Sequence, residues 1–164
     1  HKLLQWPSTI WRFAQDLIDV MPVDLIEQAE VIAGPATGGA IVAHTIAGLL
    51  DGRRPMTHPP YSFAPFGDQE GKPTLSPFYA KSMRGRRVLI VDDVRNTGTT
   101  FKRCADLVAA AGGTVIGTVQ IIDRCEASVS LDVPNVALVE YKAPPNHPAA
   151  SCPMCAANEP ITSF

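Results

Sequence analysis

The chain has 164 residues and a formal net charge of −2, with 14 Lys and Arg residues against 16 Asp and Glu residues. This length suits a single hydrophobic core, and the charge provides no basic surface that would gather nucleic acid. The apolar runs are far shorter than the ~20 residues of a membrane-spanning helix, and the first residues do not resemble a secretory signal. We therefore expect a cytoplasmic protein without nucleic-acid or membrane partners.

The N-terminal third of the chain shows helical periodicity interrupted by one strand. In chain order, the sequence predicts a helix, a short helix, a strand and a third helix over residues 10–21, 23–29, 31–33 and from the loop at 34–39 to about Leu50. Ser8 or Thr9 would cap the first helix. Small residues on one face of the third helix would let it approach a sheet closely.

Proline and glycine dominate the middle of the chain. Residues 51–60 are predicted to connect the third helix to a short strand over residues 61–64. Residues 65–77 lack apolar periodicity, which favours a mobile surface loop, and residues 78–83 are expected to return as a strand.

No proline occurs between Pro77 and Pro134, so regular structure is expected there. Residues 88–91 read VLIV, an unbroken apolar run typical of a parallel strand covered on both faces. A helix over residues 101–111, ended by Gly112 and Gly113, and strands over 114–122 and 136–141 follow. This order predicts an α/β fold with a mainly parallel sheet flanked by helices, followed by an irregular Pro-rich tail.

The strongest motif is VLIVDDVRNTGTT, residues 88–100, where the buried strand passes through two carboxylates into a small polar loop and a helix. Backbone N–H groups at a helix N-terminus favour an anion, and a phosphate monoester fits such a loop. Gly98 lacks a Cβ and can adopt a positive φ or allow close approach. A simple strand–helix corner with capping residues is the alternative. The candidate phosphate-binding residues are Arg95, Asn96, Thr97, Gly98, Thr99 and Thr100.

Asp92 and Asp93 are adjacent at the end of this strand. Successive side chains of a strand point to opposite faces, so we expect the two carboxylates to point apart and to have separate roles.

A second loop, GPATGG, follows the first predicted strand and precedes the third helix. It lacks the Lys-Ser/Thr ending of a nucleotide P-loop and the GxGxxG spacing of a dinucleotide site, which excludes both. Its backbone donors suit an anion, with a plain tight turn as the alternative. The candidate donors are Ala36, Thr37, Gly38 and Gly39.

The motif at residues 88–100 resembles the phosphoribosyl pyrophosphate (PRPP) signature of the type I phosphoribosyltransferases. The resemblance implies that its loop binds the 5′-phosphate of PRPP and that Asp92 and Asp93, as catalytic residues, hold the ribose hydroxyls or their Mg²⁺. It also implies that residues 36–39 bind the pyrophosphate. The implied fold is a single domain over 1–164, with a hood from the N- and C-terminal segments (1–30 and the tail 141–164) and a core over 31–140.

IIDR at residues 121–124 and SCPMC at 151–155 are similar to bacterial orotate phosphoribosyltransferases. In that family an arginine at the position of Arg124 binds the orotate carboxylate, and a guanidinium suits a planar carboxylate. The resemblance thus implies that Asn96 and Arg124 bind the base. A surface ion pair of Arg124 with Asp123 or Glu126 is the alternative.

The loop at 65–77 departs from the family pattern, because basic residues expected in this lid are replaced by Ala64-Pro65 and Ser76-Pro77. Lys72 is the sole cation left within it and the candidate to close on the pyrophosphate, beside the acidic residues Asp68 and Glu70. A solvated lysine is the alternative. The charge balance weakens the case for catalysis or for orotate, because it attracts a polyanion less.

The resemblance implies an Mg²⁺-dependent, homodimeric enzyme that transfers the phosphoribosyl group of PRPP to a small nitrogenous base, with orotate favoured. A purine or another pyrimidine, or a catalytically silent PRPP sensor, stays open. Cys152 and Cys155 provide two thiol ligands and His147 a third, whereas structural zinc needs four, so zinc is not expected. The four cysteines are expected to be reduced thiols.

Overall fold

The computed structural model describes residues 2–55, 57–126, 129–142 and 147–160. Its helices and strands are, in chain order, a 3-10 helix (Lys2–Gln5), α1 (Pro7–Val20), α2 (Val23–Gln28), β1 (Val31–Pro35), α3 (Gly38–Arg53), β2 (Ser62–Gln69), β3 (Lys72–Thr74), α4 (Pro77–Met83), β4 (Arg87–Arg95), α5 (Thr99–Ala110), β5 (Thr114–Asp123), β6 (Asn135–Glu140), a 3-10 helix (Ala149–Ser151) and α6 (Pro153–Ala156).

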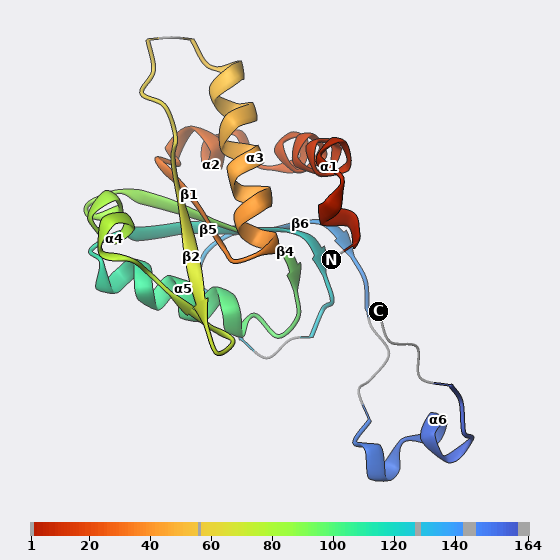
Figure 1. The fold of residues 1–164 in the computed structure, drawn as a ribbon. Coiled ribbons are helices and arrows are strands. Elements are labelled where there is room, and N and C mark those ends of the chain that lie inside the picture. The colour runs from red at the N-terminus through yellow and green to blue at the C-terminus, as the bar shows by residue number, and fades with distance from the viewer. Residues whose placement is uncertain (1, 56, 127–128, 143–146, 161–164) are drawn as a thin grey trace.

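The strands form one sheet in the order β3-β2-β1-β4-β5-β6, in which only the β2–β3 pair is antiparallel. Helices α1 to α3 cover one face, and α4 and α5 cover the other (Figure 1). The VLIV run alternates between the two cores: Leu89 and Val91 face the first group of helices, and Val88 and Ile90 face α5. The predicted parallel sheet flanked by helices is confirmed.

The segment predicted as a loop over residues 65–77 contains a β-hairpin instead. β2 continues past residue 64 because Phe66, fully buried, still pairs with Pro35 of β1. The chain then turns at Glu70 and Gly71, both with positive φ, and β3 pairs back through Lys72. Within residues 65–77 Phe66 is the one buried side chain, so this hairpin shows no apolar periodicity that would predict it.

The segment predicted as a strand over residues 78–83 is helix α4. Ser76 is its N-cap, and its hydroxyl accepts a 3.5 Å hydrogen bond from the Tyr79 amide, while Pro77 occupies the first helical turn. Proline at this position is pre-organised for a helix start. The apolar residues of such a short segment are compatible with both the strand and the helix periodicity. The Ser76 cap and Pro77 favour the helix.

The bounds of α1 and α3 also differ from the prediction. Helix α1 begins at Pro7 after Trp6, which makes no side-chain cap bond, so neither Ser8 nor Thr9 caps it. Helix α3 runs to Arg53, three residues beyond the predicted end.

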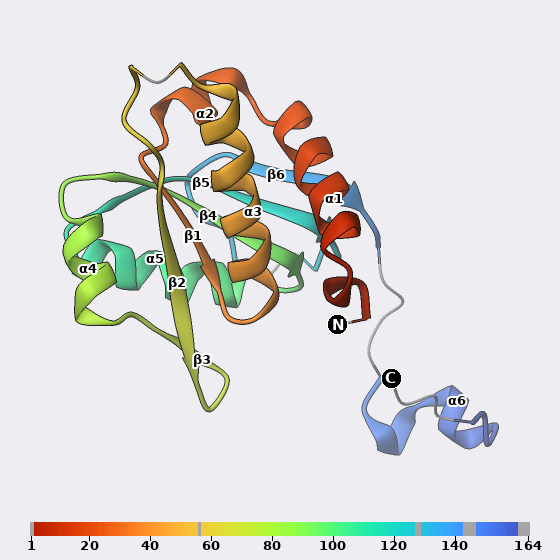
Figure 2. The ribbon, with the colours of Figure 1, turned by 45° about the horizontal axis from the view of Figure 1, so that its top comes forward.

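The N-terminal helices and the C-terminal tail differ in how they pack against the sheet. Helix α1 packs on α3 and reaches β5 and β6, whereas the short helices of the tail stand away from α1 in both ribbon views (Figures 1 and 2). Among the described residues, the covering at this edge of the sheet therefore comes from the N-terminal helices. In the described part of the chain, no helix combines the length and apolar character that crossing a membrane requires.

Candidate active site

The loops after β1, β2 and β4 meet at the carboxyl ends of the parallel strands and enclose a cavity of about 220 Å³. Its lining residues are Pro35, Ala36, Thr37, Gly38, Gly67, Asp68, Gly71, Pro73, Asp92, Asp93 and Thr100. Asp92 and Thr100 also line a neighbouring cavity of about 100 Å³ formed by the loop before α5. Ligands of open α/β sheets bind at this edge, so the two loops singled out from the sequence serve one region.

Glycines at the start of α3 let its backbone approach the acid pair. A Cβ at Gly38 would overlap the carboxylate of Asp93, and a Cβ at Gly39 would lie 2.8 Å from Oδ1 of Asp92. Thr37 precedes the helix without a side-chain cap bond, and the peptide bond before it is cis. The first amides of a helix lack acceptors within the helix, so this turn offers donors beside the cavity.

Asp92 and Asp93 both direct their carboxylates to the first turn of α3. Oδ1 of Asp92 accepts a 2.9 Å hydrogen bond from the Asp93 amide, and Oδ1 of Asp93 accepts one of 2.9 Å from the Val94 amide. The prediction that the two side chains point apart is wrong, because each carboxylate folds back onto the following amide instead of projecting straight from the strand.

The Asp92 side chain is buried, with the residue only 8% exposed. Burial, followed by repulsion from the Asp93 carboxylate, raises the pKa of Asp92 to about 8. This shift favours the protonated form of Asp92, which can donate a hydrogen bond. The site thus places a donor beside an acidic neighbour, a combination that suits paired hydroxyl groups.

The loop before α5 has the shape that the sequence predicts for a phosphate site. Gly98 is the N-cap with φ of 83°, and a Cβ there would overlap the carbonyl oxygen of Val129. The hydroxyl oxygens of Thr97 and Thr99 lie 2.8 Å apart. Position 98 requires glycine for two reasons: its φ is positive, as expected, and the Val129 carbonyl lies where a Cβ would be.

Arg95 borders the same loop, but its guanidinium is held within the protein. Nη1 donates to Oδ2 of Asp123 at 2.8 Å, and Nη2 donates to the Val129 carbonyl at 2.9 Å. Its role at the 5′-phosphate therefore stays a prediction, and its observed partners are protein atoms.

The structure brings together the two residues predicted to bind the base. Nη1 of Arg124 donates to Oδ1 of Asn96 at 3.1 Å, across the ends of β4 and β5. Arg124 also forms an ion pair with Glu126 at 3.1 Å, which is one of the two alternatives considered for it. Both side chains of that pair are 30% exposed, so the guanidinium remains accessible to a ligand.

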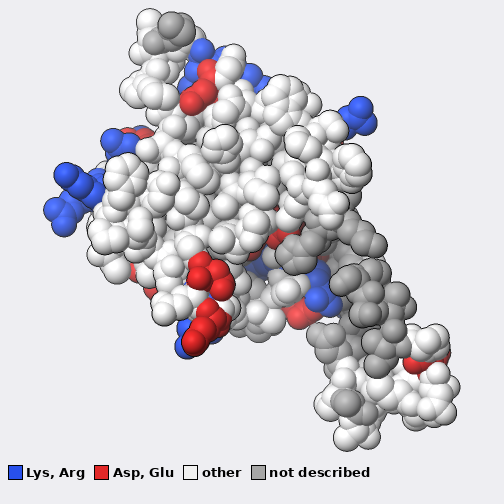
Figure 3. Space-filling view, in the orientation of Figure 1, with Lys and Arg blue, Asp and Glu red and all other residues white. Residues whose placement is uncertain are grey.

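The β2–β3 hairpin closes one side of the larger cavity. Asp68, Gly71 and Pro73 line that cavity, whereas Lys72 is exposed and is not among the lining residues. Figure 3 shows acidic atoms gathered over the end of this hairpin, with basic atoms beside them. The hairpin therefore presents negative charge to the cavity, and the role of Lys72 stays a prediction.

Comparison with known proteins decides the family. The phosphoribosyl transferase domain matches residues 10–135, which is well over half of the chain. The chain belongs to this family. It is 29% identical over 160 residues to an orotate phosphoribosyltransferase of Caldanaerobacter subterraneus subsp. tengcongensis, covering 98% of this chain and 77% of the relative. It is 30% identical over 160 residues to that of Novosphingobium aromaticivorans, with the same coverage.

Solved phosphoribosyltransferases share the fold. The crystal structure of orotate phosphoribosyltransferase from Aeropyrum pernix superposes with a TM-score of 0.62 at 25% identity, covering 84% of this chain and 74% of that one. Adenine phosphoribosyltransferase from Thermoanaerobacter pseudethanolicus gives a TM-score of 0.62 at 20% identity, covering 85% and 84%. The type I phosphoribosyltransferase fold that the signature predicted is confirmed.

The acid pair of this phosphoribosyltransferase suits a magnesium ion held largely by a substrate. Carboxylate oxygens are hard ligands that Mg²⁺ accepts, and the ion usually keeps waters and substrate oxygens. Asp92 and Asp93, which line the cavity together, are the residues that would hold the ion. Among the described residues, including Cys152 and Cys155, no three His, Cys, Asp or Glu side chains gather as a metal site.

Sequence reasoning missed two residues of this region. The sequence indicates Asp68 only as an acidic neighbour of Lys72, because the direction of its side chain depends on how β2 pairs with β3. Asp123 was considered only as a partner for Arg124. Its pairing with Arg95 follows from strand register, since these two residues lie opposite each other in β4 and β5.

Proposed function

We propose that this phosphoribosyltransferase transfers the 5-phosphoribosyl group of PRPP to a nitrogen of orotate, giving orotidine 5′-phosphate and pyrophosphate. The observation that carries the proposal is the meeting of two amide-rich helix starts over one acid pair, in adjoining cavities at the carboxyl edge of the sheet. The substrate class follows the family, and orotate follows the relatives named above.

Each loop has a role that its geometry supports. The loop before α5 would bind the 5′-phosphate through backbone amides and the hydroxyls of Thr97 and Thr99. The first turn of α3 would hold the departing pyrophosphate. Asp92 and Asp93 would hold the ribose hydroxyls, the first as a donor and the second as an acceptor.

No nucleophile from the protein is needed for this reaction. The bond from the sugar to pyrophosphate breaks as the base nitrogen approaches, and positive charge develops on the ribose ring. The protein contributes orientation and fixed donors at the leaving group, effects worth several kcal/mol each in a water-excluded site. When bound, Mg²⁺ would neutralise charge on the pyrophosphate.

The base would lie against Asn96 and Arg124, which already contact each other. The orotate carboxylate would replace part of the Glu126 contact with Arg124, because a planar carboxylate can take two guanidinium hydrogen bonds. A base without a carboxylate would gain nothing from this exchange, which favours orotate over uracil.

A second candidate, a PRPP-binding regulator without catalysis, is favoured by the hairpin. Asp68 faces the cavity, and Lys72, the cation of this lid, does not line it, so the structure places no lid cation where it would stabilise a leaving polyanion. A purine acceptor is the remaining alternative, and the fold likeness to an adenine phosphoribosyltransferase keeps it in the test.

The experiment is a pyrophosphate-release assay with PRPP and Mg²⁺ against orotate, uracil, adenine, guanine and hypoxanthine, with a no-base control. Release with orotate alone supports the proposal, and release with another base replaces the acceptor. Calorimetric binding of PRPP without release from any base supports the regulator. Absence of PRPP binding at millimolar concentration contradicts both. Light scattering in solution tests the proposed homodimer, and fractionation tests the proposed cytoplasmic location.

A further inference from the structure

The ends of β4 and β5 are joined by an ion pair between Arg95, which the sequence predicts to bind the phosphate, and Asp123, which belongs to neither predicted ligand set. Arg95 and Asp123 lie opposite each other in the strand register, and Nη1 of Arg95 donates to Oδ2 of Asp123 at 2.8 Å. The two side chains are 17% and 6% exposed, so the pair is largely removed from water. A desolvated pair is costly to break from one side, which makes it a strong local constraint.

Asp123 is saturated with hydrogen bonds. Its Oδ2 also accepts from the side-chain amides of Gln120 at 3.3 Å and Asn135 at 3.2 Å, and its Oδ1 accepts from the Cys125 amide at 2.8 Å. Burial alone raises the pKa of Asp123, but the bonds from Arg95, Cys125 and Asn135 outweigh it and lower the pKa. Asp123 therefore stays charged and fixes the turn that carries Arg124.

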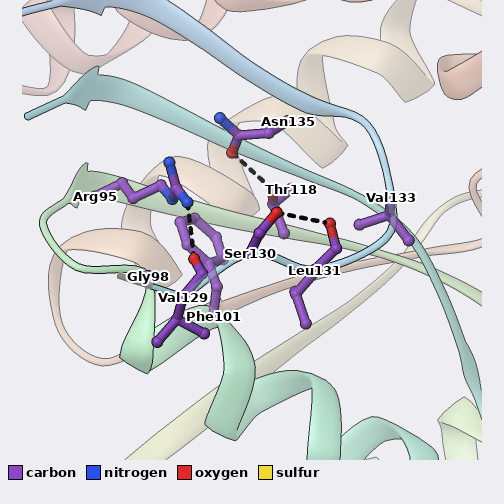
Figure 4. Close-up of a pocket in the computed structure, with 9 residues that line it drawn as sticks. All are labelled: Arg95, Gly98, Phe101, Thr118, Val129, Ser130, Leu131, Val133 and Asn135. Atoms are coloured by element: carbon purple, nitrogen blue, oxygen red, sulfur yellow. Dashed lines mark hydrogen bonds between the residues drawn. The ribbon is translucent and has the colours of Figure 1, made fainter. Parts of the chain in front are cut away.

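The other arm of Arg95 fastens a third segment. Nη2 donates to the Val129 carbonyl at 2.9 Å, and the Val129 amide donates to the carbonyl of Thr97 at 3.0 Å. Figure 4 shows the Arg95 guanidinium reaching from the end of β4 to Val129, above Gly98. Position 98 therefore requires glycine, because a Cβ there would overlap the carbonyl oxygen of Val129.

These contacts lock two loops into one unit. The loop that carries Asn96 to Thr100 and the turn that carries Arg124 are joined by the Arg95 side chain, by the Asp123 carboxylate and by the bond from the Arg124 amide to the Arg95 carbonyl at 2.9 Å. If the loop at residues 96–100 shifts when it binds a phosphate, the turn that carries Arg124 must therefore move with it or become more rigid.

We propose that Arg95 and Asp123 are positioning residues that couple occupancy of the phosphate loop to the order of the base-binding turn. Arg95 acts here through Asp123 and Val129 rather than as a phosphate ligand. This inference rests on the proposed function for the identity of the two ligands, while the mechanical link between the two loops stands on the geometry alone.

Hydrogen exchange measured by mass spectrometry tests the link first without ligand. Arg95→Met and Asp123→Asn should each speed exchange in both loops, at residues 96–101 and in the turn at 123–126, by about fivefold or more. The effects of the two substitutions should be less than additive in the double variant, because each single variant already removes the Arg95–Asp123 pair, while the bond of Arg95 to Val129 and the other bonds of Asp123 contribute separately. Asp106→Asn is the matched control, since this exposed carboxylate on α5 pairs only with Lys102 in the part of the chain described.

Ribose 5-phosphate, the phosphorylated sugar alone, is the probe for coupling. In the unmodified protein it should slow exchange in both loops, and in Asp123→Asn it should protect only the phosphate loop. Arg95→Lys, which keeps the charge opposite Asp123, should restore much of the transmission lost in Arg95→Met. If Asp123→Asn does not fold, the Lys and Met variants of Arg95 carry the comparison.

Two outcomes overturn the inference. One is unchanged exchange of the turn at 123–126 in both single variants, and the other is additive effects in the double variant. A further result would make Arg95 a direct phosphate ligand and would also overturn the inference. In it, ribose 5-phosphate no longer protects the phosphate loop of Arg95→Met but still protects both loops of Asp123→Asn. Failure of ribose 5-phosphate to protect either loop of the unmodified protein contradicts the proposed function, and the ligand-free measurements then decide the inference separately.

Discussion

The amide of Asp93 donates a 2.9 Å hydrogen bond to Oδ1 of Asp92, and both carboxylates face the glycines that begin α3. This arrangement raises the pKa of Asp92 when the chain folds. Its pKa in the folded protein is about 8, raised by burial and then by Asp93, whereas its ordinary value is 3.8.

The first prediction concerns stability and pH. Between pH 4 and pH 8 the folded protein holds a proton on Asp92 that the unfolded chain has lost, so stability falls as pH rises through this window. Asp92→Asn should therefore raise the melting temperature at pH 8, where the gain is on the order of a few kcal/mol, and change it little at pH 4. Thermal melts across this range test the sign, with Asp106→Asn, an exposed substitution on α5, as the control.

The second prediction concerns Asp93. Asp93→Asn keeps the size of the side chain but removes the acceptor charge next to the proposed ribose site. We expect kcat for pyrophosphate release to fall about 100-fold or more while the melting temperature stays within a few degrees. Steady-state kinetics with PRPP and the active base provide the measurement. Turnover at the level of the unmodified protein would exclude the assigned role.

The third prediction compares two glycines. Gly98→Ala introduces a Cβ at φ of 83° and against the Val129 carbonyl, so it should destabilise the fold by at least about 1–2 kcal/mol and weaken PRPP binding. Gly48→Ala is the matched control, because this exposed helical position has no atom within 4 Å of the new Cβ. It should stabilise by up to about 1 kcal/mol. Urea denaturation measures both, and equal effects would contradict the structure of the loop.

The fourth prediction concerns the acidic hairpin. Asp68 lines the cavity proposed for pyrophosphate, so Asp68→Asn should lower KM for PRPP about threefold to tenfold, most clearly at low ionic strength. The amide can still accept the bond that the Gly71 amide donates to Oδ1, at 3.1 Å, which should preserve the turn. Lys72→Met tests the opposite charge. If neither substitution changes the KM for PRPP, the hairpin does not contribute to the pyrophosphate site.

Several features were readable because their causes are local. The apolar run at residues 88–91 predicts a strand buried on both faces, and Leu89 and Ile90 indeed face opposite cores. Gly98 within a polar loop before a helical pattern predicts a left-handed N-cap, since only the residue and its neighbours decide that conformation. Ser76-Pro77 is a helix-start signal as well, and the prediction of a strand over residues 78–83 did not use it.

The sequence by itself therefore determined the strand–helix order apart from the hairpin within 65–77 and helix α4, and it located the two glycine loops proposed to bind anions. Periodicity, glycine and helix-start signals allowed this because they act over a few residues. The tertiary structure alone decided that Asp68 faces the cavity, that Asp92 is buried beside Asp93, and that Arg95 pairs with Asp123. These outcomes depend on strand register and on burial by residues far away in the chain. Desolvation and ion pairing arise only when those distant segments pack together.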